Sequence, residues 1–96
     1  MTMRLRPDEI RLDGEWKMVS GQMVADAVSS RIATLVEKHL EKVAANGWDT
    51  LYRDPQDGRY WELLYLHSER HGGGPPSLVQ VTRDDVKIKY GLNVPR

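Results

Sequence analysis

Apolar residues recur at helical spacing through the first half of the chain. They fall at offsets of 0, 4, 7, 8, 12 and 15, at Val28, Ile32, Leu35, Val36, Leu40 and Val43. This spacing places them on one face of an amphipathic helix, which we predict over residues 25–46. Asp26 suits the N-cap of that helix, and Gly47 suits the left-handed position just after it.

The pattern changes to that of strands after Gly47. Residues 48–53 and 59–66 are rich in aromatic and branched side chains. The segment between them, Asp54-Pro55-Gln56-Asp57-Gly58, has the residues of a tight turn. We therefore predict a β-hairpin. Its second strand is apolar on both faces, which indicates a central place in the sheet, with a helix over one face and loops over the other.

Weaker signals predict further strands. Residues 15–19 suit a short strand, Ser20-Gly21-Gln22 a turn, and residues 23–24 a brief returning strand. Residues 77–82 suit another strand.

A helix start follows at Thr82. Thr82 and Asp85 have the spacing of a capping box, so we predict a short helix over residues 83–90, ended by Gly91. The elements together predict an α+β fold: a small antiparallel sheet with one long amphipathic helix packed on one face and a short C-terminal helix. We expect residues 1–96 to form a single domain, with an N-terminal arm over 1–13 and a tail over 92–96.

Composition narrows the class of protein. The 96 residues carry 14 Lys+Arg and 14 Asp+Glu, and 40% are hydrophobic, which is typical of a folded globular domain. The zero net charge removes the electrostatic reason to expect binding to nucleic acid or to an anionic membrane. The absence of cysteine excludes disulfides, thiolate catalysis and Cys-based zinc sites. No apolar stretch approaches the roughly 20 residues of a membrane span, and no signal-peptide pattern is present, so we expect a cytoplasmic location.

The loop over residues 67–76 offers candidate chemistry. Gly72-Gly73-Gly74 resembles a phosphate loop, but two prolines and a strand follow it instead of a helix. His67, Glu69 and His71 are potential metal ligands, but the glycines argue against the helix that their spacing would need. We expect no metal and no cofactor, and favour a structured loop or a partner-binding loop.

Carboxylates around the hairpin are the other candidates for catalysis. Turn formation already explains Asp54 and Asp57. A small ligand-binding protein or hydrolase that uses Glu62 with His67 and His71 remains an alternative. Residues 49–69 contain five Asp/Glu and two Arg, so a local acidic patch is compatible with the neutral chain.

Aromatic residues cluster on the hairpin. Tyr52, Tyr60 and Trp61 are flanked by Arg53 and Arg59. Such residues either build the core or anchor a protein interface. The sequence leaves both roles open.

Several motifs resemble those of one known family. They are the run from Gly47 to Leu63 (GWDTLYRDPQDGRYWEL), the segment HGGGPP over residues 71–76 with Leu78, Gly14-x-Trp16, Val24-Ala25-Asp26, Arg31-Ile32 and Lys89-Tyr90. Together they span about residues 7–90 and resemble the immunity protein 27 family of bacterial polymorphic toxin systems. The resemblance implies a small, cytoplasmic, non-catalytic protein that binds and neutralises a cognate toxin domain.

We expect the hairpin turn and the glycine loop to bind the toxin. The expected contact residues are Arg53, Asp54, Asp57, Arg59, Trp61, Glu69, Arg70, His71, Gly72, Gly73 and Gly74. Internal ion pairs that join the hairpin to the loop are the alternative for several of them. We expect the free protein to be a monomer or a weak homodimer, and a self-associating structural module is a further alternative.

Overall fold

The structure is a computed structural model, which describes residues 4–65 and 74–94. Its elements are β1 (Arg11–Asp13), β2 (Trp16–Val19), β3 (Gln22–Ala25), α1 (Ala27–Thr34), η1 (Leu35–His39), β4 (Glu41–Asn46), β5 (Asp49–Arg53), β6 (Tyr60–Leu64), β7 (Ser77–Val81) and α2 (Arg83–Tyr90). The predicted α+β class is confirmed. Among the described residues, neither helix is long and apolar enough to cross a membrane.

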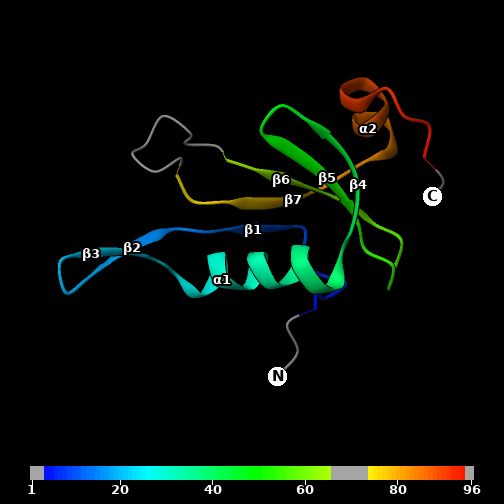
Figure 1. Cartoon of the computed structure of the whole chain (residues 1–96). Helices are drawn as coiled ribbons and strands as arrows, with labels where there is room; N and C mark the ends of the chain where they lie inside the picture. The colour runs from blue at the N-terminus through cyan, green and yellow to red at the C-terminus, as the bar shows by residue number, and fades with distance from the viewer. Residues whose placement is uncertain (1–3, 66–73, 95–96) are drawn as a thin grey trace.

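Five strands form one antiparallel sheet in the order β1-β7-β6-β5-β4. The helix α1 lies under one face of this sheet, and α2 lies over part of the other (Figure 1). The central place predicted for the second hairpin strand is confirmed, because β6 has two strands on each side.

The main core lies between the sheet and α1. Alternation along β6 points Trp61 and Leu63 toward the helix, where Trp61 has no exposed surface. The buried residues that join them are Leu5, Leu12, Ile32, Leu35, Leu40 and Leu78. Apolar burial of this kind is the main stabilising term for a small domain.

A smaller core lies under α2. It contains Leu51 and Tyr60 from the sheet and Val86 from the helix. Leu92 and Val94, from the expected tail, pack against this cluster as partly buried residues. The second face of β6 is therefore covered by a helix, rather than by the loops that the sequence led us to expect.

The long helix predicted over residues 25–46 is wrong in its second half. Asp26 caps α1 as expected, and its side chain accepts a hydrogen bond from the Ser29 amide at 2.8 Å. The helix then widens into the π turn η1, closed by a Leu40 N–H···O=C Leu35 bond of 2.8 Å. Leu40 is extended (φ −111°, ψ 149°), and β4 begins at the next residue.

The last two residues of the apolar spacing, Leu40 and Val43, lie outside the helix. Leu40 is buried, but as an extended residue after the π turn. Val43 lies at an irregularity of register in β4 and is 38% exposed. Gly47 does have positive φ (+64°), but in the turn between β4 and β5 instead of at a helix end.

Three other local predictions are confirmed. The hairpin of β5 and β6 has the expected turn. The strands predicted at 15–19 and 23–24 are β2 and β3, joined by Ser20 and Gly21, which both have positive φ. Thr82 and Asp85 make both bonds of a capping box at the start of α2, and Gly91 ends that helix with φ +68°.

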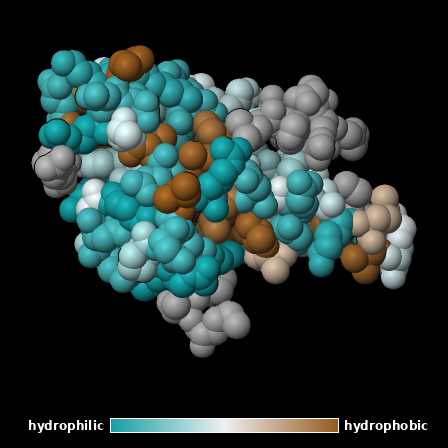
Figure 2. Space-filling model, turned by 180° about the vertical axis from the view of Figure 1, so that it is seen from behind, coloured by the Kyte–Doolittle hydropathy of each residue, from teal (hydrophilic) through white to brown (hydrophobic). Residues whose placement is uncertain are grey.

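The hairpin of β2 and β3 projects beyond the sheet (Figure 1). Met18, Val19 and Val24 are among its exposed apolar residues. Figure 2 shows brown and tan side chains at the outer end of the molecule that this hairpin forms.

The N-terminal segment is built into the fold. Within the expected arm, residues 11–13 form β1, which pairs with β7, and Leu5 is buried in the main core. Arg31 holds the segment from α1, because its two terminal nitrogens bond both Glu9 carboxylate oxygens at 2.6 and 2.7 Å. The hydrogen bonds from Arg31 lower the pKa of Glu9 to about 2.

Candidate functional site

The β5–β6 turn is held by its own residues. The Asp54 carboxylate accepts from the Gln56 amide at 2.9 Å, and the Asp54 carbonyl accepts from the Gly58 amide at 2.7 Å. The Asp57 carboxylate accepts from the backbone and the side chain of Arg59 at 3.0 and 2.6 Å. The turn-forming roles that we inferred for Asp54 and Asp57 are therefore present, and Asp54 is buried.

Arg59 ties the hairpin to the N-terminal segment. Its guanidinium donates to the carbonyls of Glu9 at 2.6 Å and Arg6 at 2.9 Å, and to the Gln80 side chain at 3.1 Å. It also lies 4.8 Å from the centre of the Trp61 ring. Arg59 is therefore held by internal contacts, but these join the hairpin to the N-terminal segment instead of to the glycine loop that the alternative named.

The remaining expected contact residues divide into three groups. Trp61 and Gly74 are buried, and Trp61 belongs to the core instead of a recognition patch. Arg53 is partly exposed and pairs with Glu41 on the neighbouring strand at 3.3 Å. Glu69, Arg70, His71, Gly72 and Gly73, with His67 of the alternative hypothesis, lie outside the described residues.

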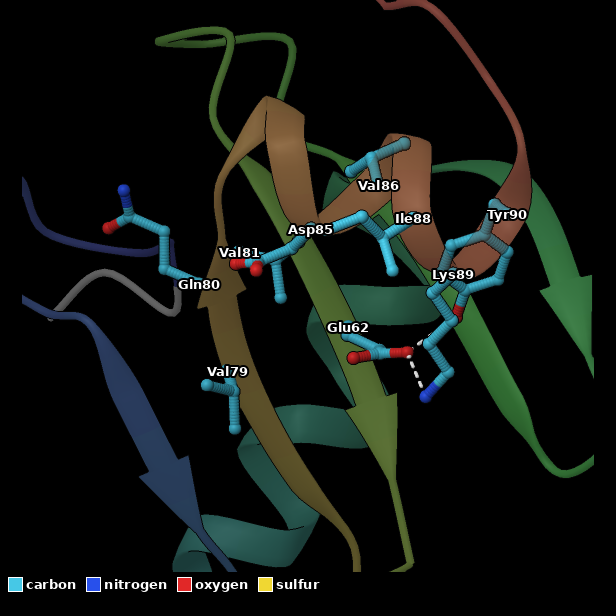
Figure 3. Close-up of a pocket in the computed structure, with 9 residues that line it drawn as sticks. All are labelled: Glu62, Val79, Gln80, Val81, Asp85, Val86, Ile88, Lys89 and Tyr90. Atoms are coloured by element: carbon cyan, nitrogen blue, oxygen red, sulfur yellow. Dashed lines mark hydrogen bonds and ion pairs between the residues drawn. The ribbon is translucent and has the colours of Figure 1, made fainter.

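A groove lies between α2 and the neighbouring strands. It has a volume of about 390 Å³ (Figure 3). Its lining residues are Glu62, Val79, Gln80, Val81, Asp85, Val86, Ile88, Lys89 and Tyr90. We call it the α2 groove. Its walls are mainly apolar, and its charged groups come from β6 and α2.

Glu62, on β6, lines the α2 groove and bonds two residues at the end of α2. Its carboxylate accepts from the Tyr90 hydroxyl at 2.7 Å and pairs with the Lys89 ammonium at 2.6 Å (Figure 3). Lys89 also donates to the Asp49 carboxylate at 2.6 Å. Glu62 is buried, so these partners offset the cost of removing its charge from water.

The pKa values of this cluster follow from those contacts. Burial disfavours the charged form of Lys89, but the hydrogen bonds to Asp49 and Glu62 outweigh it and raise the pKa of Lys89. Burial, and then the bond to the Glu62 carboxylate, raise the pKa of Tyr90. At neutral pH the lysine is therefore charged and the phenol is neutral.

These contacts give Glu62 a structural role. The hydrolase alternative needs its carboxylate to converge with His67 and His71, but in the structure the carboxylate secures α2. Within residues 4–65 and 74–94, no three His, Asp or Glu side chains are grouped as metal ligands.

Sequence reasoning missed the residues around this cluster. Lys89 and Tyr90 entered as the end of the predicted short helix and as a motif of the resemblance, and Trp48 as the start of a strand and as part of another motif. Trp48 instead lies in the β4–β5 turn and is 83% exposed. Gly47 was the available signal, because glycine favours the positive φ of a turn (here +64°) and turns lie at the protein surface.

The fold defines a small α+β domain in which an antiparallel sheet carries a helix on each face. The family model for immunity protein 27 matches residues 18–82, more than half of the chain. The chain therefore belongs to the immunity protein 27 family. No curated protein and no solved structure matches it.

Proposed function

We propose that this protein is a non-catalytic, stoichiometric inhibitor that binds a cognate toxin domain of a bacterial polymorphic toxin system and neutralises it. The observation that carries this proposal is the match to the immunity protein 27 family over residues 18–82. Membership of an immunity family implies a protein partner. The cytoplasm of the cell that makes the toxin, or of its kin, is the compartment in which we expect the two to meet.

The geometry of the carboxylates supports binding over catalysis. A general acid or base must reach the proton that it transfers. Asp54 and Asp57 instead hold the hairpin turn, and Glu62 holds Lys89 and Tyr90. These three carboxylates thus have structural partners.

Co-expression tests the proposal directly. The toxin domain encoded beside this gene is induced in a sensitive bacterium with this protein or with an unrelated folded protein at the same level. We expect growth to be restored only by this protein, and the two purified proteins to elute as a one-to-one complex. Continued growth arrest without a complex, with both proteins folded, would overturn the proposal.

A further inference from the structure

Two exposed features meet where α2 ends. One is Trp48, in the turn between β4 and β5. The other is the α2 groove, with Ile88 at its rim. Lys89 links them, because it lines the groove and bonds the residues on both sides of the Trp48 turn.

Trp48 is presented on a fixed support. Its side chain is 83% exposed, although burial of an indole is strongly favourable. Before the turn, the Asn46 side chain donates to the Lys89 carbonyl at 3.1 Å; after it, Asp49 bonds the Lys89 ammonium at 2.6 Å. A large aromatic ring on a backbone that is already ordered loses little entropy on binding, which is typical of an interface anchor.

The α2 groove supplies apolar surface beside this anchor. Val79, Val81 and Val86 line it, and Ile88 is 85% exposed at its rim. Ile88 and Trp48 are therefore two exposed apolar side chains on segments that the contacts of Lys89 join.

The charges around the groove favour one kind of occupant. Glu62 and Asp85 line it, and Asp49 lies against Lys89. Lys89 is the only cation among the lining residues, and it is shared between Asp49 and Glu62. On the neighbouring strand β1, Arg11 is paired with Asp13 at 2.7 Å. Two carboxylates and one ammonium therefore line the groove, and Asp49 lies behind that ammonium. The lining carries more negative than positive charge, so the groove suits a cationic group with an apolar stem.

We propose that Trp48 and the α2 groove form the docking surface for the toxin domain. A lysine or arginine side chain of the toxin enters the groove, with its stem against the valines and its charge toward Glu62. An apolar depression of the toxin receives Trp48. This inference rests on the proposed function and specifies the surface and the chemistry of the partner.

Affinity measurements on four variants test the surface. The probe is the catalytically inactivated toxin domain encoded beside this gene, titrated by calorimetry. We expect Trp48→Ala to raise Kd about 10–100-fold. Ile88→Lys should raise Kd about tenfold through charge repulsion, and Ile88→Glu should bind at least several-fold more tightly than Ile88→Lys.

The control variant is Met18→Ala, on the projecting β2–β3 hairpin. Met18 is 65% exposed, so it is an exposed apolar side chain away from the proposed surface. We expect its Kd to match that of the wild type. The three side chains replaced in these four variants are solvent-exposed, so melting temperatures should stay close to the wild-type value and separate binding from folding.

Each contrary result has a distinct meaning. Wild-type affinity in Trp48→Ala and Ile88→Lys, with neutralisation intact, overturns the docking surface and leaves the proposed function standing. Equal weakening by Ile88→Lys and Ile88→Glu overturns the cationic occupant. A free wild-type dimer that Trp48→Ala makes monomeric assigns the surface to a second copy of this chain. A wild-type protein that neither binds nor neutralises the toxin removes the proposed function itself.

Discussion

At the scale of single residues, Arg59 has a structural role that its place in the sequence does not indicate. The sequence places it beside a turn, where we expected an interface role and kept an internal role as the alternative. Its bond to the Glu9 carbonyl spans 50 residues, so no local pattern predicts it. The bonds of Asp54 and Asp57, in contrast, stay within the turn and were predictable from turn chemistry.

Arg59→Ala is expected to lower the free energy of unfolding by about 2–3 kcal/mol, because it leaves the carbonyls of Arg6 and Glu9 without their charged donor. Urea unfolding followed by circular dichroism measures the loss. Under conditions in which the variant is fully folded, it should bind the toxin domain with wild-type affinity. An unchanged melting temperature with lost binding would instead make Arg59 an interface residue.

Glu9 gives the stability a defined dependence on pH. Its pKa is lowered from 4.5 to about 2 by Arg31, so the folded state favours the charged carboxylate. The resulting stability is fully present above pH 4.5 and is lost as the pH falls toward 2, with a magnitude of about 2–3 kcal/mol.

The measurement is a series of unfolding curves between pH 7 and pH 2, for the wild type and for Glu9→Gln. The variant should be less stable at pH 7, and the difference between the two proteins should shrink below pH 4. A difference that stays constant across this range would show that the Glu9–Arg31 pair does not contribute through its charge. The comparison is needed because Asp13, Asp26 and Asp85 also have lowered pKa values and add to the acid dependence of both proteins.

At the scale of elements, most of the β-structure and the C-terminal helix followed from the sequence, and the long helix did not. Caps and tight turns are encoded by neighbouring residues, so Asp26, Thr82 and Gly58 were informative. The end of the long helix is decided by tertiary structure. Residues 41–46 pair with β5 as an edge strand, and that pairing outweighs an apolar spacing that Leu40 and Val43 happen to continue.

Gly14 joins β1 to the β2–β3 hairpin at a point with no room for a side chain. A Cβ there would lie 2.8 Å from the Pro76 carbonyl oxygen and would also meet the Ser29 side chain. We expect Gly14→Ala to lower the free energy of unfolding by about 1–3 kcal/mol, measured by chemical denaturation. The double variant Gly14→Ala, Ser29→Ala should recover part of this loss. Wild-type stability in the single variant would contradict the close packing at this junction.

At the scale of the whole molecule, the candidate docking surface depends on segments that the sequence keeps apart. Asp49 and Lys89 are 40 residues apart and meet only because α2 folds back over the sheet. Sequence patterns predicted the hairpin and the short helix, but they contain no information on which turn lies beside which helix end. For this reason the expected interface was placed at the β5–β6 turn and the glycine loop, and Trp48 was not among the expected contact residues.

Shortening the projecting β2–β3 hairpin should change the shape of the molecule but not its stability. Lys17 pairs with Val24, so residues 18–23 can be replaced by Asn-Gly to make a shorter hairpin with a two-residue turn. We expect the free energy of unfolding to change by less than about 1 kcal/mol, because residues 18–22 are all exposed. Small-angle scattering should show a radius of gyration below that of the wild type (13.9 Å for the Cα atoms). A collapse of stability would show that the hairpin supports the core.

The contrast between Trp48 and Trp61 has a spectroscopic consequence. Trp61 is fully buried and Trp48 is 83% exposed, so the two indoles are in opposite environments. The emission of Trp48 should lie at long wavelength and be quenched by iodide, whereas that of Trp61 should resist quenching. If the toxin covers Trp48, the intrinsic fluorescence of the unlabelled protein will shift to shorter wavelength and become less sensitive to iodide as the complex forms. The partly exposed Trp16 accounts for the quenching that remains.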